Sequence, residues 1–221
     1  MYIDAHSHQP SPGPEITTLW SVSPHAFPAI IPPHTLIAAG VHPWDTGDVA
    51  AADAALARLE TLAATNKLAA IGECGLDRLR GAPLPQQTEI LRRQLILAER
   101  YHLPVVTHDV RAFPELLALR RIYRRTPWLI HGFGGNTAIA AQLLAKDCLL
   151  SFGVAVLRRP RIMAWIKELP PAAWLLETDA SGQDIVAIYH ALAAGLNIDL
   201  ELLQQRQLDN FQHFLAPVPP P

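Results

Sequence analysis

Six histidine, glutamate and aspartate side chains each stand at the end of a short apolar run in this 221-residue chain. Apolar runs of about four to eight residues are typical of buried β-strands, so these polar groups are expected at strand ends. Imidazoles and carboxylates are also common ligands of divalent metals. The pattern therefore predicts a metal centre built from His6, His8, Glu73, His108, His131 and Asp179.

The N-terminal half contributes three of these candidates. His6 and His8 are two positions apart, and alternate residues of a strand face the same side. Glu73 lies between Gly72 and Gly75, which predict tight backbone turns on either side of it. A carboxylate there could bridge two cations and lower their mutual repulsion. Structural alternatives exist, because a polar strand end explains the histidines and a helix cap or an ion pair explains Glu73.

The other three candidates close the later apolar runs. His108 ends LPVVTH, His131 ends PWLIH and Asp179 ends WLLETD. Taken singly, each histidine fits a hydrogen-bonded structural role, and the aspartate fits a ligand, a general base or a helix cap. The shared position of all six favours metal ligation, because active sites of parallel barrels lie at the carboxyl ends of the strands.

A centre with two divalent ions would use all six groups. The predicted division is His6, His8 and Asp179 on one metal, His108 and His131 on the other, and Glu73 bridging them. Two metals about 3.5–4 Å apart stabilise a phosphoryl displacement and lower the pKa of bound water. The aspartate would orient or deprotonate that water, so Asp179 and Glu73 are the predicted catalytic residues of a hydrolase.

The elements that position these groups can also be predicted. Short buried strands are expected at residues 2–6, 18–23, 35–41, 68–73, 103–108, 128–131, 148–153 and 174–178. Several are continuous apolar runs, which is typical of parallel strands covered on both faces. Helices are expected at residues 49–65, 86–101, 112–125, 137–146, 158–168, 184–195 and 199–214. This alternation predicts an α/β fold, a distorted TIM-type (β/α) barrel.

The first part of the chain departs from the alternation. Segments 9–17 and 24–34 are rich in proline, which disrupts helix interiors. The first covering helices are therefore expected to be shortened or missing. Residues 1–221 are expected to form a single hydrolase barrel domain, with a disordered tail at 216–221.

Composition limits the classes of function. A formal net charge of -2 argues against strong nonspecific nucleic-acid binding through net charge alone, although it is compatible with a local basic rim. The two cysteines and an N-terminus without a signal-peptide pattern favour a reducing, cytoplasmic location. Apolar runs fall far short of the roughly 20 residues that span a bilayer, so no membrane association is expected. The sequence leaves the oligomeric state open.

The ordered motifs around the six candidates resemble the TatD family of metal-dependent hydrolases, within the amidohydrolase-like superfamily. They are IDAHSH at 3–8, AAGVHPW at 38–44, AAIGECGLD at 69–77, LPVVTHDVRA at 103–112, WLIHGFGG at 128–135 and LLETDA at 175–180. The resemblance covers most of the chain. It implies a distorted barrel, two divalent metal ions and hydrolysis of phosphodiester bonds, since deoxyribonuclease activity has been attributed to family members. The metal could be Zn, Mn, Mg, Ni or Fe.

Other residues near these motifs are candidates for binding substrate. His42 matches a family histidine near the pocket, which implies a contact to substrate or to a metal ligand, and a buried turn histidine is the alternative. Arg78 and Arg111 are candidates for phosphate contact. Further candidates for phosphate contact are Arg80, Arg158 and Arg159. Trp44 could stack a base. For all of these residues the alternative is an ordinary role at the surface or in packing.

Two segments depart from the family pattern. After His108 the chain reads Asp109-Val110-Arg111-Ala112, and after LLETDA it continues with Ser181-Gly182-Gln183. The loops that would hold a nucleic-acid strand are therefore shortened, while the metal ligands are intact. The leading hypothesis is a phosphodiesterase or deoxyribonuclease acting through a metal-activated water. The alternatives are a hydrolase of a small phosphoester, lactone or amide, and a metal-binding barrel that acts as a structural partner with little turnover.

Overall fold

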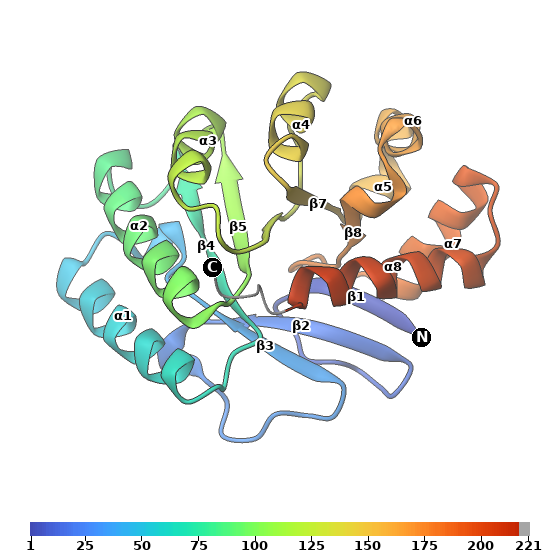
Figure 1. The fold of residues 1–221 in the computed structure, drawn as a ribbon. Coiled ribbons are helices and arrows are strands. Elements are labelled where there is room, and N and C mark those ends of the chain that lie inside the picture. Colours follow the sequence, from blue (N-terminus) through green and yellow to red (C-terminus); the bar gives the residue numbers. More distant parts are fainter. Residues whose placement is uncertain (217–221) are drawn as a thin grey trace.

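Eight parallel strands follow one another in chain order around one sheet, and helices cover most of its outer side (Figure 1). The computed structural model describes residues 1–216, so most of the tail predicted at 216–221 lies outside the described residues. The strands are β1 (Tyr2–Ser7), β2 (Ile16–Val22), β3 (Thr35–Ala39), β4 (Ala70–Asp77), β5 (Val105–Val110), β6 (Trp128–Ile130), β7 (Cys148–Phe152) and β8 (Trp174–Leu176). The predicted (β/α) barrel is confirmed.

The ends of the sheet meet at the carboxyl ends of β1 and β8. Ser7 and Asp179 form an isolated parallel bridge, and the Asp179 N–H donates to the His6 carbonyl at 3.0 Å. This contact nearly closes the barrel. It also brings the last acidic candidate beside the first histidines, although 172 positions separate Ser7 from Asp179 in the numbering.

Alternate residues of the strands fill the barrel interior. Because successive strand residues face opposite sides, each strand sends small or branched side chains inward. The end opposite the closing contact is packed by two aromatic side chains of the last helix. The resulting cluster includes Ile3, Ala5, Leu19, Ala38, Ala70, Val106, Leu129, Leu149, Leu175, Phe211 and Phe214. The interior is a packed core, which holds the strand ends at fixed positions.

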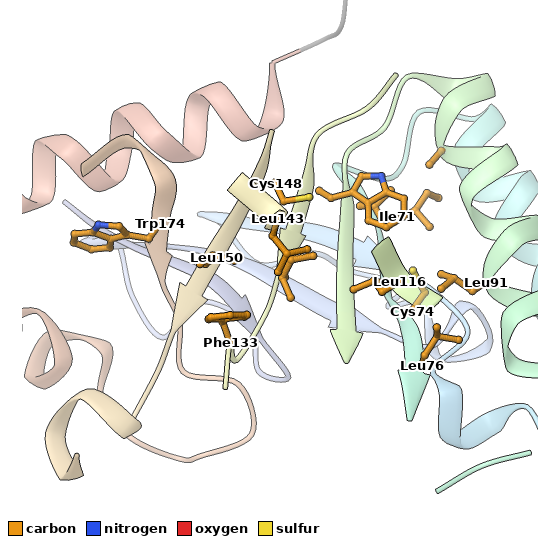
Figure 2. Close-up of a cluster of buried hydrophobic side chains, with 14 of the residues drawn as sticks. Ile71, Cys74, Leu76, Leu91, Leu116, Phe133, Leu143, Cys148, Leu150 and Trp174 are labelled. Atoms are coloured by element: carbon orange, nitrogen blue, oxygen red, sulfur yellow. The ribbon is translucent and has the colours of Figure 1, made fainter. Parts of the chain in front are cut away.

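The outward faces of the strands pack against a ring of helices. They are α1 (Val49–Ala64), α2 (Leu84–Tyr101), α3 (Phe113–Ile122), α4 (Thr137–Leu144), α5 (Ala155–Arg158), α6 (Pro160–Glu168), α7 (Ile185–Leu196) and α8 (Leu200–Leu215). Figure 2 shows part of this layer, in which Ile71 and Leu76 of β4 share one buried cluster with Leu91 of α2 and Leu116 of α3. Thus the sheet is apolar on both faces, as its continuous apolar runs predict.

The first two connections contain no α-helix. The chain passes from β1 to β2 through an irregular segment, and from β2 to β3 through a loop whose only regular element is the 3-10 turn Pro24–Ala26. Figure 1 accordingly shows loops after β1 and β2, and the first α-helix of the chain, α1, comes only after β3. The predicted loss of the first covering helices is confirmed, and the proline content of these loops accounts for it.

Three predicted elements have the wrong bounds. The helix predicted at 158–168 begins at Pro160 as α6, and Arg158 instead ends the separate short helix α5; Arg159 between them has φ −130° and ψ 98°. Pro160 explains the break, because the residue before a proline is sterically excluded from the helical region. The strands β4 and β5 run on past Glu73 and His108, so these two residues lie inside strands and not directly after them.

Gly75 explains why β4 continues. Its φ is +154°, and a Cβ atom built there would lie 2.0 Å from the His108 carbonyl oxygen. The glycine therefore permits a close approach of β4 to β5, where a sequence pattern alone suggests a turn. This approach sets the spacing between Glu73 and His108.

Within residues 1–216, no single helix is long and apolar enough to cross a membrane, and only the bent pair α7–α8, with 113° between its helices, reaches that length and composition jointly.

Candidate metal centre

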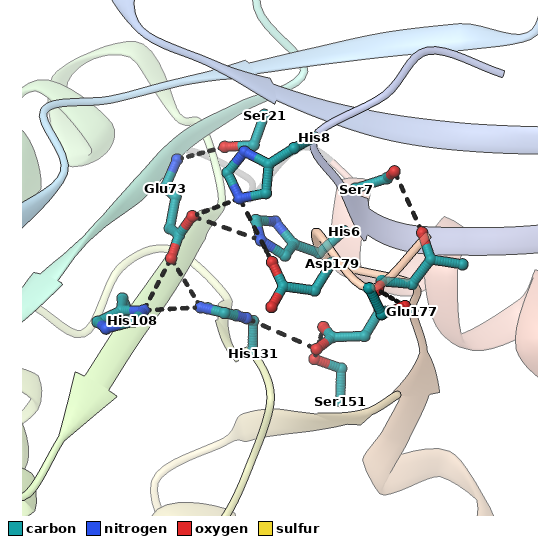
Figure 3. A network of polar contacts seen from close by, with 12 residues as sticks. His6, Ser7, His8, Ser21, Glu73, His108, His131, Ser151, Glu177 and Asp179 are labelled. Carbon is teal, nitrogen blue, oxygen red and sulfur yellow. Dashed lines mark hydrogen bonds and ion pairs between the residues drawn. The ribbon is translucent and has the colours of Figure 1, made fainter. Parts of the chain in front are cut away.

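All six predicted ligands gather around the Glu73 carboxylate at the carboxyl end of the barrel (Figure 3). They line or lie beneath a cavity of about 340 Å³. Glu73 itself is 5% exposed, and its backbone N–H donates to Ser21 Oγ of β2 at 2.8 Å. The carboxylate is therefore held at the centre of the cavity floor by its own strand and by a neighbouring one.

The two carboxylate oxygens of Glu73 face different histidine pairs. Oε2 lies 3.1 Å from His8 Nε2 and 3.5 Å from His6 Nε2. Oε1 lies 2.8 Å from both His108 Nδ1 and His131 Nε2. One carboxylate thus joins two groups of potential ligands, which is the geometry required of a bridging ligand.

The Oε2 group has the spacing of a metal site. Two ligand atoms bound about 2.0–2.1 Å from a tetrahedral ion are about 3.3–3.4 Å apart. Asp179 Oδ1 lies 3.6 Å from His6 Nε2 and 3.3 Å from His8 Nε2, close to the two Glu73 distances given above. These four nitrogen–oxygen distances are therefore close to the separation of two ligand atoms that share one divalent ion.

The Oε1 group is tighter and has fewer ligands. His108 Nδ1 and His131 Nε2 are 3.1 Å apart, in addition to their short contacts with Oε1. These three atoms would separate slightly around an ion. They would also leave coordination positions open toward the cavity, as catalytic metal sites do.

The polar atoms of the cluster are not satisfied by the protein alone. His6 Nε2 and Glu73 Oε2 are buried and have no hydrogen-bond partner among the described residues. An unsatisfied buried polar atom costs about 1–3 kcal/mol, and a cation between these atoms would remove that cost. The donor set of imidazoles and carboxylates suits a divalent ion of the Zn, Mn, Ni or Fe type, so the residues present fit a metal.

The charges of the cluster favour a cation as well. Burial alone would raise the pKa of Glu73, but the charge of His131 and hydrogen bonds from His108, His131 and His42 hold that pKa well below its usual range. Contacts with the carboxylates of Asp179 and Glu73 raise the pKa of His8 to about 9. Likewise, the facing imidazoles of His6 and His8 outweigh burial and lower the pKa of Asp179. The carboxylates thus remain charged and attract positive charge.

His42 lies in the same cavity but is placed to donate a hydrogen bond. Its Nδ1 accepts the Trp44 backbone N–H at 3.2 Å, and its Nε2 lies 3.2 Å from Glu73 Oε1. A ring whose Nδ1 accepts carries its proton on Nε2 when neutral. His42 can therefore orient the Glu73 carboxylate, and its predicted role in contacting substrate or a metal ligand stays a prediction.

Two acids support the histidines from behind, and sequence reasoning missed both. Asp77 Oδ2 lies 3.6 Å from His108 Nε2, and Glu177 Oε1 lies 3.6 Å from His131 Nδ1. Ser151 donates to the other oxygen of Glu177. A carboxylate behind a metal-ligating histidine fixes the ring and raises its basicity. The available signal was the acid closing GECGLD and the acid preceding Asp179 in LLETD.

A third acid positions Asp179. Asp4 is buried and accepts the Thr178 backbone N–H at 2.9 Å and the Thr178 hydroxyl at 2.6 Å. These bonds fix the segment that leaves β8. Asp179 follows directly with φ +52°, a left-handed conformation that aspartate tolerates better than most residues. Its carboxylate is thereby directed at His6 and His8.

The two predicted arginines do not line the cavity. Arg78 forms an ion pair with Glu115, and its Nε donates to the Arg111 carbonyl at 2.8 Å. The cavity walls are formed by His8, Ser21, Val22, Ser23, Gly40, His42, Trp44, Asp45, Glu73, His108, His131, Asp179 and Ala180. Arg158 and Arg159 are also absent from these walls. The assignment of Arg78 and Arg111 to substrate binding therefore gains no support from the geometry and stays a prediction.

Glu177→Gln is expected to weaken metal binding about 10- to 100-fold. The substitution keeps the shape of this buried side chain, but it removes the negative charge 3.6 Å from His131 Nδ1. Isothermal titration of the metal-free protein with Mn²⁺ or Zn²⁺ measures the effect. Glu168→Gln, at the exposed end of α6, is the matched control. Equal affinities for the two variants would contradict a supporting role for Glu177.

Comparison with known proteins agrees with this geometry. The model of the family described as "TatD related DNase" matches residues 28–215. The chain belongs to this family. TatD membership confirms the resemblance that the ordered motifs indicate, and together with the ligand groups it supports binding of divalent metal.

Individual TatD relatives match parts of the chain. The "Uncharacterized metal-dependent hydrolase YabD" of Bacillus subtilis is 32% identical over 149 residues, covering 64% of this chain and 57% of that protein. The "3'-5' ssDNA/RNA exonuclease TatD" of Cronobacter turicensis is 36% identical over 153 residues, covering 64% of this chain and 56% of that protein. The chain thus spans less than three fifths of the length of these curated TatD relatives.

A solved TatD structure matches nearly the whole barrel. The TatD homologue YjjV of Escherichia coli superposes with a TM-score of 0.82 at 25% identity, covering 99% of this chain and 98% of that one. The short first connections therefore fit within the TatD barrel without changing its strand order.

Proposed function

We propose that this protein is a divalent-metal-dependent phosphodiesterase of the TatD type that hydrolyses single-stranded nucleic acid. The observation that carries the proposal is the division of Glu73, whose Oε2 faces His6 and His8 while Oε1 faces His108 and His131. A bridging carboxylate between two ligand groups suits two divalent ions. When bound, such ions supply the positive charge that stabilises a phosphoryl displacement and acidify an attacking water.

The residues of the chain have distinct tasks in this proposal. His6, His8 and Asp179 would hold one ion, His108 and His131 the other, with Glu73 shared between them. Asp179 is 46% exposed at the cavity, and bonds with the two histidines hold its pKa below the usual range despite burial. It is thus ionised at neutral pH, and its carboxylate can accept a hydrogen bond from a water in the cavity and orient that water. Asp77 and Glu177 keep the histidine rings oriented.

The cavity walls offer little other positive charge to a phosphate. Among residues 1–216, no lysine or arginine lines this cavity. The charge of a phosphodiester would therefore be neutralised mainly by the bound ions, which supports strict metal dependence. At about 340 Å³, the cavity is near the lower limit of small-ligand sites. It suits one nucleotide of a flexible single strand better than a duplex.

Nuclease activity is preferred to the alternatives. The relative from Cronobacter turicensis is named an exonuclease of single-stranded DNA and RNA, and the family description names a DNase. Hydrolysis of a small phosphoester, lactone or amide would use the same metals, but no feature of the cavity favours it. The cytoplasmic location and the organisation of residues 1–221 as one domain remain predictions.

A comparison of substrates tests the proposal. Protein loaded with Mn²⁺ or Zn²⁺ is incubated with an end-labelled single-stranded oligonucleotide, the matching duplex, an aryl phosphodiester and an aryl phosphomonoester. The expected result is degradation of the single strand, slower attack on the duplex, and loss of both after chelation. Turnover of the aryl esters with an intact oligonucleotide would support the small-substrate alternative. Stoichiometric metal without any turnover would support a structural role.

A further inference from the structure

We propose that Trp44 and Arg80 form a stacking site for one nucleobase of the substrate, beside the Glu73 centre. The inference rests on the proposed nuclease function and names the part of the substrate that the protein itself recognises. The first observation is an exposed aromatic side chain. The Trp44 side chain is 46% exposed, although an aromatic side chain of this size gains most from burial.

The exposed indole of Trp44 is held in a fixed place. Its Nε1–H donates to Asp77 Oδ2 at 2.6 Å, and its backbone N–H donates to His42 Nδ1 at 3.2 Å. The ring also meets the His42 ring edge-to-face, with centroids 4.6 Å apart. These contacts hold the exposed ring in one orientation, so a base that stacks on it meets a preorganised surface.

Trp44 stands where a base would lie if its phosphate were at the metal centre. The residue forms part of the wall of the main cavity and of a second hollow beside it, which also includes Ser23, Asp45 and Asp48. Its ring centroid is 5.9 Å from that of His108, one of the proposed ligands. A nucleotide with its phosphate over Glu73 can therefore place its base on Trp44 and continue into the second hollow.

Arg80 lies over one face of the Trp44 ring. Its guanidinium lies 4.4 Å from the Trp44 ring centroid, and a guanidinium plane stacks on aromatic rings as a base does. Arg80 is exposed, and no carboxylate within residues 1–216 pairs with it. Arg78, in contrast, is bound to Glu115. Arg80 is thus free to yield its place to a base and to pair with a neighbouring phosphate.

The cavity is better suited to bind a nucleic-acid strand by stacking on a base than by contacts to phosphates. Its walls contain no lysine or arginine among the described residues, so the protein's own side chains offer a strand few phosphate contacts there beyond the metal centre. Stacking on a tryptophan accepts every base, because every base has an aromatic face. The proposed site therefore predicts low sequence preference, together with a requirement for a base next to the cleaved bond.

Two substitutions separate stacking from the bond to Asp77. Trp44→Leu removes the ring and the bond, whereas Trp44→Phe loses the N–H but keeps an aromatic face, although a smaller one than the indole. Hydrolysis of an octathymidylate is compared with that of the same octamer carrying abasic sugars. Because Trp44→Leu loses the stacking contact with one base, its KM for the thymidylate is expected to be about tenfold higher than that of wild type. Its KM for the abasic strand is expected to be unchanged. Trp44→Phe is expected to restore most of the affinity.

Leu79→Ala serves as the matched control, because Leu79 is a 61% exposed apolar side chain that neighbours Arg80 in the loop after β4 and does not line the cavity. Equal KM values for wild type and Trp44→Leu on the thymidylate would overturn the proposal. An equal loss on both strands would also overturn it, since that result would show that Trp44 acts only by positioning Asp77 and His108.

A binding measurement distinguishes this inference from the proposed function. Tryptophan fluorescence of the metal-free protein is titrated with octathymidylate and with the abasic octamer. Quenching by the thymidylate alone, lost in Trp44→Leu, supports the stacking site even if wild-type protein hydrolyses neither strand. Equal quenching of wild type and Trp44→Leu overturns the site even if hydrolysis is observed. Arg80→Ala is expected to lower the salt dependence of thymidylate binding by about one counterion.

Discussion

Glu73→Gln is expected to lower hydrolysis of single-stranded DNA by about a thousandfold or more, by analogy with removing a preorganised charge from other active sites. The substitution retains the shape of the side chain but removes the charge that faces both histidine pairs. An amide cannot bridge two cations as a carboxylate does, because its NH₂ group has no lone pair for a metal. Hydrolysis rates and metal content, measured on the same protein samples, check this expectation.

The fold should survive this change. The carboxylate is buried and carries charge, so its removal also relieves a desolvation cost. The neighbouring imidazoles can release their protons once the acid is gone. We therefore expect the melting temperature of the metal-free protein to stay within a few degrees of wild type. Glu89→Gln, which breaks the exposed pair with Arg92 on α2, is the control. Full activity in Glu73→Gln would refute the shared-carboxylate centre.

The sequence allowed the strand-end candidates to be chosen because they follow a simple rule. In a parallel barrel all strands point the same way, so any polar residue closing an apolar run is carried to one end. The rule needs no knowledge of which strands are neighbours. His6 and Asp179 are brought together by closure of the barrel between β1 and β8, which their positions in the sequence do not reveal.

The supporting residues lie beyond that rule. Asp77 matters because its carboxylate lies behind a histidine of the next strand, and Asp4 because it bonds to Thr178 across the closing contact. Each side chain has a partner distant in sequence, and many exposed or capping acids would look the same in the printed chain. Only the register between strands distinguishes them.

The same limit applies to the basic residues. Arg78 and Arg80 are two positions apart and indistinguishable as candidates for phosphate contact. In the folded protein one is neutralised by Glu115 and the other lies over Trp44. Strand length failed for a related reason, because Gly75 reads as a turn but serves a close contact between β4 and β5. Pro160 was the one local signal at 158–168 that should have divided the predicted helix.

Removal and return of metal should change stability as well as activity. His6 Nε2 and Glu73 Oε2 are buried without hydrogen-bond partners among residues 1–216, and an ion that satisfies them binds only the folded chain. A ligand at a hundred times its dissociation constant stabilises by about 2.7 kcal/mol. For a chain of this length each kcal/mol shifts the melting temperature by about 2–4 °C. We therefore expect the melting temperature of protein stripped with a chelator to rise by about 5–10 °C when Mn²⁺ or Zn²⁺ is added back.

Single-histidine variants test how the ions are divided. His8 belongs to the Oε2 group and His131 to the Oε1 group. If each group holds its own ion, His8→Ala and His131→Ala should each lose about one equivalent of bound metal and keep part of the thermal shift. The control variant His190→Ala, on the exposed side of α7, should keep the full metal content and the full thermal shift. Complete loss of metal in either ligand variant would instead mean that the two groups act as one site. Such a site would hold a single ion, and Glu73 would then be an ordinary ligand and not a bridge.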